Sequence, residues 1–217
     1  FKNYVGRVAE FLIYRVDIYL ISFFMSKSAL GLYVIAVNIV ERLWMISESV
    51  SLVLFSKLTS TKDVEKQDYL SSYTLRINFL MSLCGGLIVL ASIKVFIYIF
   101  FGSDYQESST YVMILLPGVI LQSVSMMMKK ILEARGNPGR NAVASTICLV
   151  FNVLANIILI PKMGVLGAAL STSATYILYF FIQANSLKKK FAITRRSYLF
   201  IGINDFVDLY NLVKKKI

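Results

Sequence analysis

Six long apolar segments dominate this chain and decide its fold class. They cover approximately residues 8–25, 30–58, 72–101, 110–132, 142–160 and 165–187. A helix needs about 20 apolar residues to cross the roughly 30 Å hydrocarbon core of a membrane, and every segment comes close to that length or exceeds it. Hydrophobic residues make up 57% of the 217 positions and the mean hydropathy is +0.68, which is too apolar for an ordinary water-soluble domain. We therefore predict an all-α membrane protein with six transmembrane helices.

Short polar turns separate these segments, and no linker divides the apolar region. Gly136-Asn137-Pro138-Gly139 is a dense turn signal, Pro161 predicts the end of the fifth helix, and Pro117-Gly118 predicts a kink in the fourth. Residues 1–190 are therefore expected to form one six-helix lobe. Residues 191–217 are expected to form a basic amphipathic tail on the cytoplasmic surface of the membrane. Because the chain begins at Phe1 with charges already in its first apolar segment, we expect it to be part of a longer protein.

The basic residues mark alternate gaps between the apolar segments. Clusters of Lys and Arg occupy the start of the chain and residues 57–76, 129–140 and 188–196, whereas the intervening gaps carry few cations. Since cytoplasmic loops retain positive charge during membrane insertion, both chain ends are predicted to be cytoplasmic, in the cytoplasmic (inner) membrane. The net charge of +11 is thus interpreted as a topology signal, and nucleic acid is not an expected partner.

The rest of the composition argues against an enzyme or a metalloprotein. The sequence has no histidine, which is the usual general base and the commonest metal ligand. Cys84 and Cys148 both lie in apolar segments, without the spacing of a metal or redox motif. We therefore expect no catalytic residues, no metal site and no cofactor, apart from possible coupling to H⁺ or Na⁺.

Four charges in the first two apolar segments require an explanation. Arg15 and Asp17 lie at about the same depth as Glu41 and Arg42 on what are predicted to be neighbouring antiparallel helices. Each unpaired charge at the centre of a bilayer costs about 2.5–3.5 kcal/mol, so pairing or a wet cavity is required. The natural cross-helix pairs are Arg15 with Glu41 and Asp17 with Arg42.

A polar face on the second segment distinguishes two roles for these charges. Asn38, Glu41, Met45 and Glu48 share one narrow helical face, which favours the wall of a cavity. The alternative is that the charges only hold two helices together. In a cavity, Arg15 and Arg42 suit a phosphate or pyrophosphate, because a guanidinium group binds two oxygens at once. Asp17, Glu41 and Glu48 are the candidates for coupling to a proton or Na⁺.

Further polar residues in later segments are weaker candidates for substrate binding. They are Gln122 in the fourth segment and Asn152 and Asn156, which share one face of the fifth. Hydrogen bonding between helices is the favoured role for most of them, because polar groups in transmembrane bundles commonly find such partners.

Taken together, several motifs resemble one family. They are Arg15-Val-Asp17, the run from Leu30 to Ala36, Gly136-Asn137-Pro138, the pair Asn152 and Asn156, Ile160-Pro161, and the run from Gly164 to Ala169. Over about residues 1–190 the chain resembles Wzx-type polysaccharide flippases of the MOP superfamily, which also contains MATE exporters and the lipid II flippase MurJ. The resemblance implies the C-terminal lobe of a two-lobe transporter with an alternately open central cavity. It also implies that the protein flips undecaprenyl-pyrophosphate-linked oligosaccharide for polysaccharides such as the O-antigen of lipopolysaccharide, with Arg15 and Arg42 receiving the anionic head.

Other functions stay open at this point. A MATE-type exporter of organic cations would favour an acidic cavity, and a lipid II-type transporter would share most of the same features. A membrane-embedded glycan polymerase or ligase would also use arginines, but such enzymes usually have a large polar outer loop. Finally, the chain could be a half-protein that dimerises or the product of a truncated gene. The partners that we expect are a lipid-linked oligosaccharide, the bilayer and a separate N-terminal lobe.

Overall fold

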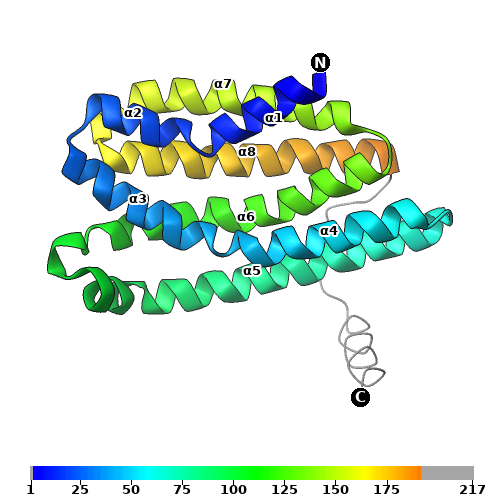
Figure 1. Cartoon of the computed structure of the whole chain (residues 1–217), viewed down its shortest axis with the longest axis horizontal. Coiled ribbons are helices and arrows are strands. Elements are labelled where there is room, and N and C mark those ends of the chain that lie inside the picture. Colours follow the sequence, from blue (N-terminus) through cyan, green and yellow to red (C-terminus); the bar gives the residue numbers. More distant parts are fainter. Residues whose placement is uncertain (1, 192–217) are drawn as a thin grey trace.

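The computed structural model describes residues 2–191, and in this range the chain is a bundle of helices without strands (Figure 1). The elements are α1 (Lys2–Ile13), α2 (Val16–Phe24), α3 (Lys27–Glu41), α4 (Trp44–Ser60), α5 (Val64–Phe101), the short 3₁₀ helix η1 (Ser103–Tyr105), α6 (Ser108–Ala134), α7 (Pro138–Met163) and α8 (Val165–Phe191). The helices run side by side, and the turns between them alternate between the two ends of the bundle. The predicted all-α membrane fold is confirmed.

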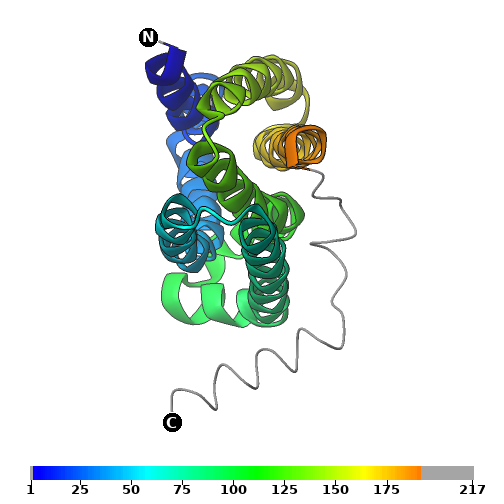
Figure 2. The ribbon, with the colours of Figure 1, turned by 90° about the vertical axis from the view of Figure 1, so that its right-hand side faces the viewer.

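Helix α6 lies at the centre of the bundle. It packs against α3, α4, α5 and α8, and the end-on view places it between the α7–α8 pair and the α4–α5 pair (Figure 2). One buried apolar cluster joins α2, α3, α6 and α8 through side chains such as Ile21, Tyr33 and Leu115. A second cluster joins α4, α5, α6 and α8 around Leu58, Leu75 and Met128. The two clusters hold α6 along its whole length.

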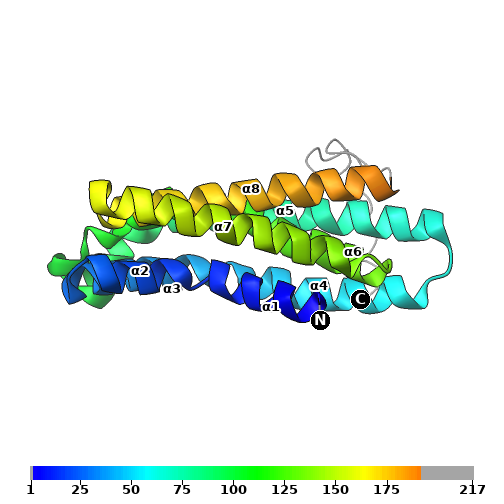
Figure 3. The same cartoon turned by 90° about the horizontal axis from the view of Figure 1, so that it is seen from above.

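The spans fit the predicted segments unevenly. Four described helices, α5 to α8, are long and apolar enough to cross a membrane, and there are five spans if α3 and α4, bent by 40°, are counted as one. Six spans were predicted. The first predicted segment, 8–25, is built from two short helices, α1 of 12 residues and α2 of 9. They follow one another along α7 (Figure 3), and neither has the length of a span by itself.

The observed helix ends differ slightly from the ends that the turn signals predict. Gly164 has a φ of 61°, a left-handed conformation that glycine adopts without strain, and it ends α7. Helix α7 continues through Pro161 to Met163, beyond the predicted stop, because a proline in the last turn removes only one backbone hydrogen bond. Helix α5 begins at Val64, before the apolar segment, since the Asp63 carboxylate accepts hydrogen bonds from the backbone N–H groups of Glu65 and Lys66.

The basic gaps lie at one end of the bundle. The α4–α5 turn, the α6–α7 turn and the end of α8 all lie at the right of Figure 1, and they carry the predicted Lys and Arg clusters. This arrangement agrees with the alternation that the sequence predicts. The amphipathic tail predicted for residues 191–217 lies outside the described residues, except for Phe191 at the end of α8.

Candidate functional site

Two helices break at the residues that carry the charges. The chain leaves the helix at Tyr14 and Arg15, between α1 and α2, and again at Arg42 and Leu43, between α3 and α4. At both breaks the backbone makes shorter-range hydrogen bonds, as from Arg15 N–H to the Leu12 carbonyl and from Leu43 N–H to the Val40 carbonyl. Non-helical backbone at membrane depth is tolerated where it is buried in protein or lines a cavity. The two breaks therefore mark the candidate site.

An ion pair connects the two broken helices. The Arg15 guanidinium donates from its two terminal nitrogens to the two carboxylate oxygens of Glu41, both at 3.2 Å. The Arg15 side chain is 39% exposed and that of Glu41 17%, so the pair lies at the edge of the protein interior. The predicted pairing of Arg15 with Glu41 is confirmed.

A double-mutant cycle tests the strength of this pair. Arg15→Ala and Glu41→Ala should each lower the amount of membrane-inserted, correctly folded protein, because each leaves one charge without its partner. The double variant Arg15→Ala/Glu41→Ala should recover much of the loss, since contacting residues are not additive. Fluorescence-detected size-exclusion chromatography measures the folded yield of all three variants. Losses that simply add in the double variant would refute the coupling.

Asp17 turns away from the other charges. It lies in the first turn of α2, is 1% exposed, and accepts hydrogen bonds from Tyr33 Oη (2.5 Å), Thr172 Oγ1 (2.9 Å) and the backbone N–H of Ile18 (2.8 Å). The predicted pair of Asp17 with Arg42 is therefore wrong. The break before α2 directs Asp17 toward α3 and α8, where two hydroxyl groups and the helix N-terminus stabilise its carboxylate.

Arg42 lies in an open, polar cavity. Its side chain is exposed and makes no hydrogen bond or ion pair with any residue whose side chain the structure describes. This cavity, which we call the charged cavity, has a volume of about 460 Å³ and is lined by both arginines and both glutamates of the predicted site. Its lining is Tyr14, Arg15, Asn38, Glu41, Arg42, Trp44, Met45, Glu48 and Met126. The predicted polar face, from Asn38 to Glu48, thus lies on a cavity.

Aromatic rings hold the two breaks together. The ring of Trp44 lies 5.1 Å from that of Tyr14 and 5.6 Å from that of Tyr176 on α8. The Trp44 indole N–H donates to the Val119 carbonyl of α6, and Gln122 donates to the Tyr14 hydroxyl at 2.8 Å. Because these contacts join both breaks to the central helices, the cavity wall has a rigid support.

The remaining predicted site residues lie away from this cavity wall. Gln122 is 2% exposed and reaches the cavity only through Tyr14. Asn152 and Asn156 are completely buried between α7 and α8, where Asn152 donates to Thr175 and Asn156 donates to Asn152. Their role in substrate binding stays a prediction, and their contacts support the alternative of hydrogen bonding between helices.

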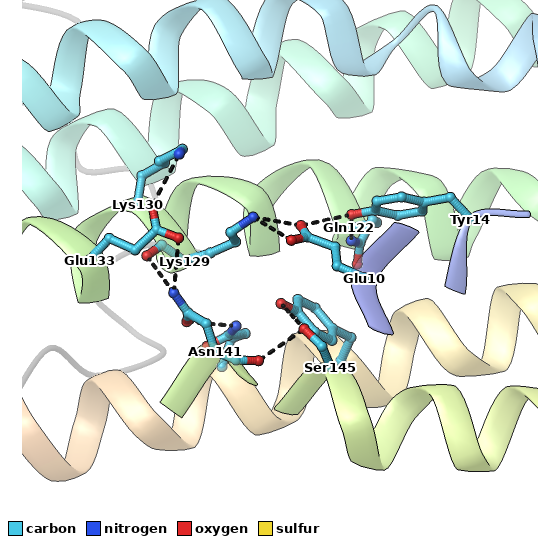
Figure 4. Close-up of polar contacts among 10 residues, drawn as sticks. Glu10, Tyr14, Gln122, Lys129, Lys130, Glu133, Asn141 and Ser145 are labelled. Carbon is cyan, nitrogen blue, oxygen red and sulfur yellow. Dashed lines mark hydrogen bonds and ion pairs between the residues drawn. The ribbon is translucent and has the colours of Figure 1, made fainter. Parts of the chain in front are cut away.

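A second polar cluster did not emerge from the sequence. The Lys129 ammonium lies 2.6 Å from both carboxylate oxygens of Glu10, and the Tyr14 hydroxyl connects Glu10 to Gln122 (Figure 4). The sequence assigned Lys129 to a cytoplasmic loop and left Glu10 without a role. One signal was available: Glu10 lies in an apolar segment four residues before Tyr14, on the same helical face.

This cluster continues toward the α6–α7 turn. Asn141 donates to the Lys129 carbonyl and to Glu133 (Figure 4). Gln183 of α8 donates to Asn141. A smaller cavity, of about 240 Å³, lies among these residues. The contacts tie α1 to α6, α7 and α8, so the cluster positions the helix that enters the first break.

The described fold and site define a class of protein. Membrane-spanning helices that break at a polar cavity are typical of secondary transporters. The comparison with protein families agrees: the MatE family model matches residues 4–158, so the chain belongs to the MatE family and to the MOP superfamily of transporters. In the 2–191 range, no group of three potential metal ligands is present.

The chain is similar to several known or probable transporters. It is 29% identical over 175 residues to the probable low-salt glycan biosynthesis flippase Agl15 of Haloferax volcanii, a match that covers 79% of this chain and 37% of the relative. The fold is similar to the inward closed lipid II flippase MurJ, with a TM-score of 0.76, 19% identity and coverage of 98% of this chain and 46% of MurJ. An outward-facing multidrug resistance MATE transporter has a TM-score of 0.72 at 18% identity, with coverage of 94% and 47%. The chain therefore spans half or less of the length of these proteins.

Proposed function

We propose that the chain forms one lobe of a flippase that moves undecaprenyl-pyrophosphate-linked oligosaccharide across the cytoplasmic membrane by alternating access, in polysaccharide biosynthesis. The observation that carries the proposal is Arg42, an exposed guanidinium without a protein partner in a polar cavity. A guanidinium at membrane depth is costly unless it faces a wet cavity or an anionic group, and in a cavity its fork geometry suits phosphate oxygens. The glycan flippase among the relatives supports a lipid-linked glycan as the cargo.

The charge balance of the cavity bears on the rival functions. Its wall carries two arginines and two glutamates, and the Arg15–Glu41 pair neutralises one of each. An exporter of organic cations would be better served by an excess of acidic groups. The remaining charges, Arg42 and Glu48, balance, so the wall lacks the acidic excess that would suit a cationic drug, and Arg42 is the group on it that suits an anionic head. The alternatives are a MATE-type or lipid II-type transporter and, from a different class, a glycan polymerase or ligase.

The lobe is proposed to work with an N-terminal lobe that supplies the opposite wall of the cavity, with both ends of this chain in the cytoplasm. Coupling to H⁺ or Na⁺ is proposed for Asp17, Glu41 or Glu48. Among these, Glu41 is already engaged by Arg15, and Asp17 is enclosed by hydroxyl groups. No catalytic residue and no other cofactor belong to the proposal.

A reconstituted transport assay tests the proposed function. The complete transporter, with both lobes, is placed in liposomes that carry a fluorescent polyprenyl-pyrophosphate-linked oligosaccharide, and the label accessible to an outside quencher is followed over time. We expect the label to cross in protein-containing liposomes and not in protein-free ones, while a fluorescent organic cation is not accumulated. Accumulation of the cation without movement of the lipid would establish the exporter function instead.

A further inference from the structure

A third cavity lies between α3 and the end of α5. Its volume is about 430 Å³. Most of its wall is apolar, with Ile35 and Ile39 from α3 and Val89, Ile93, Phe96 and Phe101 from α5. We call this cavity the α3–α5 groove after the two helices that line it.

Two polar residues belong to both cavities. Asn38 and Arg42 line the charged cavity and also the α3–α5 groove. A ligand that touches Arg42 is therefore in reach of both a polar space and an apolar space. This division matches an amphipathic molecule, with its polar head in the charged cavity and its hydrocarbon chain in the groove.

The dimensions and the charge of the groove select a lipid chain with an anionic head. The residues that line it on α5 run from Val89 to Phe101, which corresponds to about 18 Å along a helix. Arg42 supplies a positive charge at one end of this apolar path and has no partner among the side chains that the structure describes. Charge complementarity thus calls for a phosphate at Arg42, and the apolar wall calls for hydrocarbon beyond it.

The groove differs from the ordinary lipid-facing surface of the same helix. Leu87, Val95 and Tyr98 of α5 are more than half exposed and line neither of the two cavities that share Arg42. Apolar side chains of this kind need only the bulk bilayer as a partner. An apolar cavity that ends at an unpaired guanidinium combines two features that bulk lipid does not explain together.

We infer that the α3–α5 groove holds the hydrocarbon chain of an anionic polyprenyl lipid while Arg42 holds its phosphate. The inference rests on the proposed function, and it adds the path by which the lipid chain leaves the cavity while the head stays inside. The chain would pass sideways between α3 and α5, so the apolar part of the cargo never has to enter the polar cavity.

Binding measurements with prenyl pyrophosphates of two lengths test the groove. The 217-residue chain in lipid nanodiscs is titrated with geranyl pyrophosphate and with geranylgeranyl pyrophosphate, which share a head and differ in chain length. Ser92 lines the groove and is exposed, so Ser92→Trp should fill it. Its neighbour Ala91 is also small and exposed but does not line the groove, and Ala91→Trp is the matched control.

We expect the longer ligand to bind at least about tenfold more tightly to the wild-type chain and to Ala91→Trp, because more hydrocarbon is buried. Ser92→Trp should lose this gain and still bind the short ligand. An equal gain in Ser92→Trp and Ala91→Trp would overturn the groove and leave the proposed function standing. Arg42→Gln should bind geranylgeranyl pyrophosphate no better than geranylgeraniol. If the wild-type chain also shows no preference for the pyrophosphate, or if Arg42→Gln keeps the full wild-type preference, recognition of the anionic head by Arg42 fails, and with it the proposed function.

Discussion

Replacing Arg42 by alanine in the complete transporter should abolish glycan export while the protein still inserts into the membrane. Arg42 is exposed and has no partner among the described side chains, so its removal leaves none of their buried groups unpaired. A hydrogen bond to a charged group contributes about 1.5–3 kcal/mol, and the loss of even one corresponds to an approximately 10- to 100-fold lower affinity for the head group. Export of labelled polysaccharide in cells and the lipid-flipping assay in liposomes both measure this loss.

Two further variants separate the shape of Arg42 from its charge. Arg42→Lys keeps the charge but loses the bidentate hydrogen bonding of the guanidinium group, so it should retain a small part of the export activity. Lys27→Ala removes an exposed cation from the start of the same helix, outside the charged cavity, and should export normally. Normal export by Arg42→Ala, at equal protein level, would rule out a role for this residue in cargo binding.

Gly167→Ala should prevent the correct packing of α7 against α8. A Cβ atom at Gly167 would lie 2.3 Å from the Leu159 carbonyl oxygen and 2.5 Å from its carbon, and backbone atoms cannot rotate out of the way. Overpacking of this kind costs about 3 kcal/mol, a large share of the stability of a membrane protein domain. We expect a clear fall in the thermal denaturation midpoint of the detergent-solubilised protein, together with a lower folded yield.

Gly31→Ala is the matched control for this prediction. Gly31 lies inside α3, and a Cβ atom there would have no neighbour within 4 Å. Alanine is favoured over glycine in a helix by about 0.5–1 kcal/mol, so this variant should be as stable as the wild type or slightly more stable. If Gly167→Ala and Gly31→Ala melt at the same temperature, the close approach of α7 and α8 is not as tight as described.

Much of the fold follows from local properties of the sequence. The length of the apolar segments predicts spanning helices, and the turn signal at Gly136 predicts the turn between α6 and α7. The pairing of Arg15 with Glu41 was also predictable, because charges at one depth in a membrane must be compensated and the depth follows from the helical rise. These features depend on residues close in sequence or on a constraint that the membrane imposes everywhere.

The helix breaks were not predictable in the same way. Neither Tyr14-Arg15 nor Arg42-Leu43 contains a glycine or a proline, so the usual signal for a break is missing. The breaks depend on long-range contacts instead, such as those of Trp44 with Val119, Tyr14 and Tyr176. These contacts join residues 30 to 132 positions apart, so they arise only when the helices pack, and no local pattern encodes them.

Long-range packing also decides where the individual site residues lie. The sequence by itself determined that four charges lie at membrane depth and that at least one cross-helix pair forms. Only the tertiary structure decided that Asp17 turns to Tyr33 and Thr172, which leaves Arg42 open to the cavity and the groove. Thr172 follows Asp17 by 155 positions, so its hydroxyl group reaches the carboxylate only after α2 and α8 have packed together.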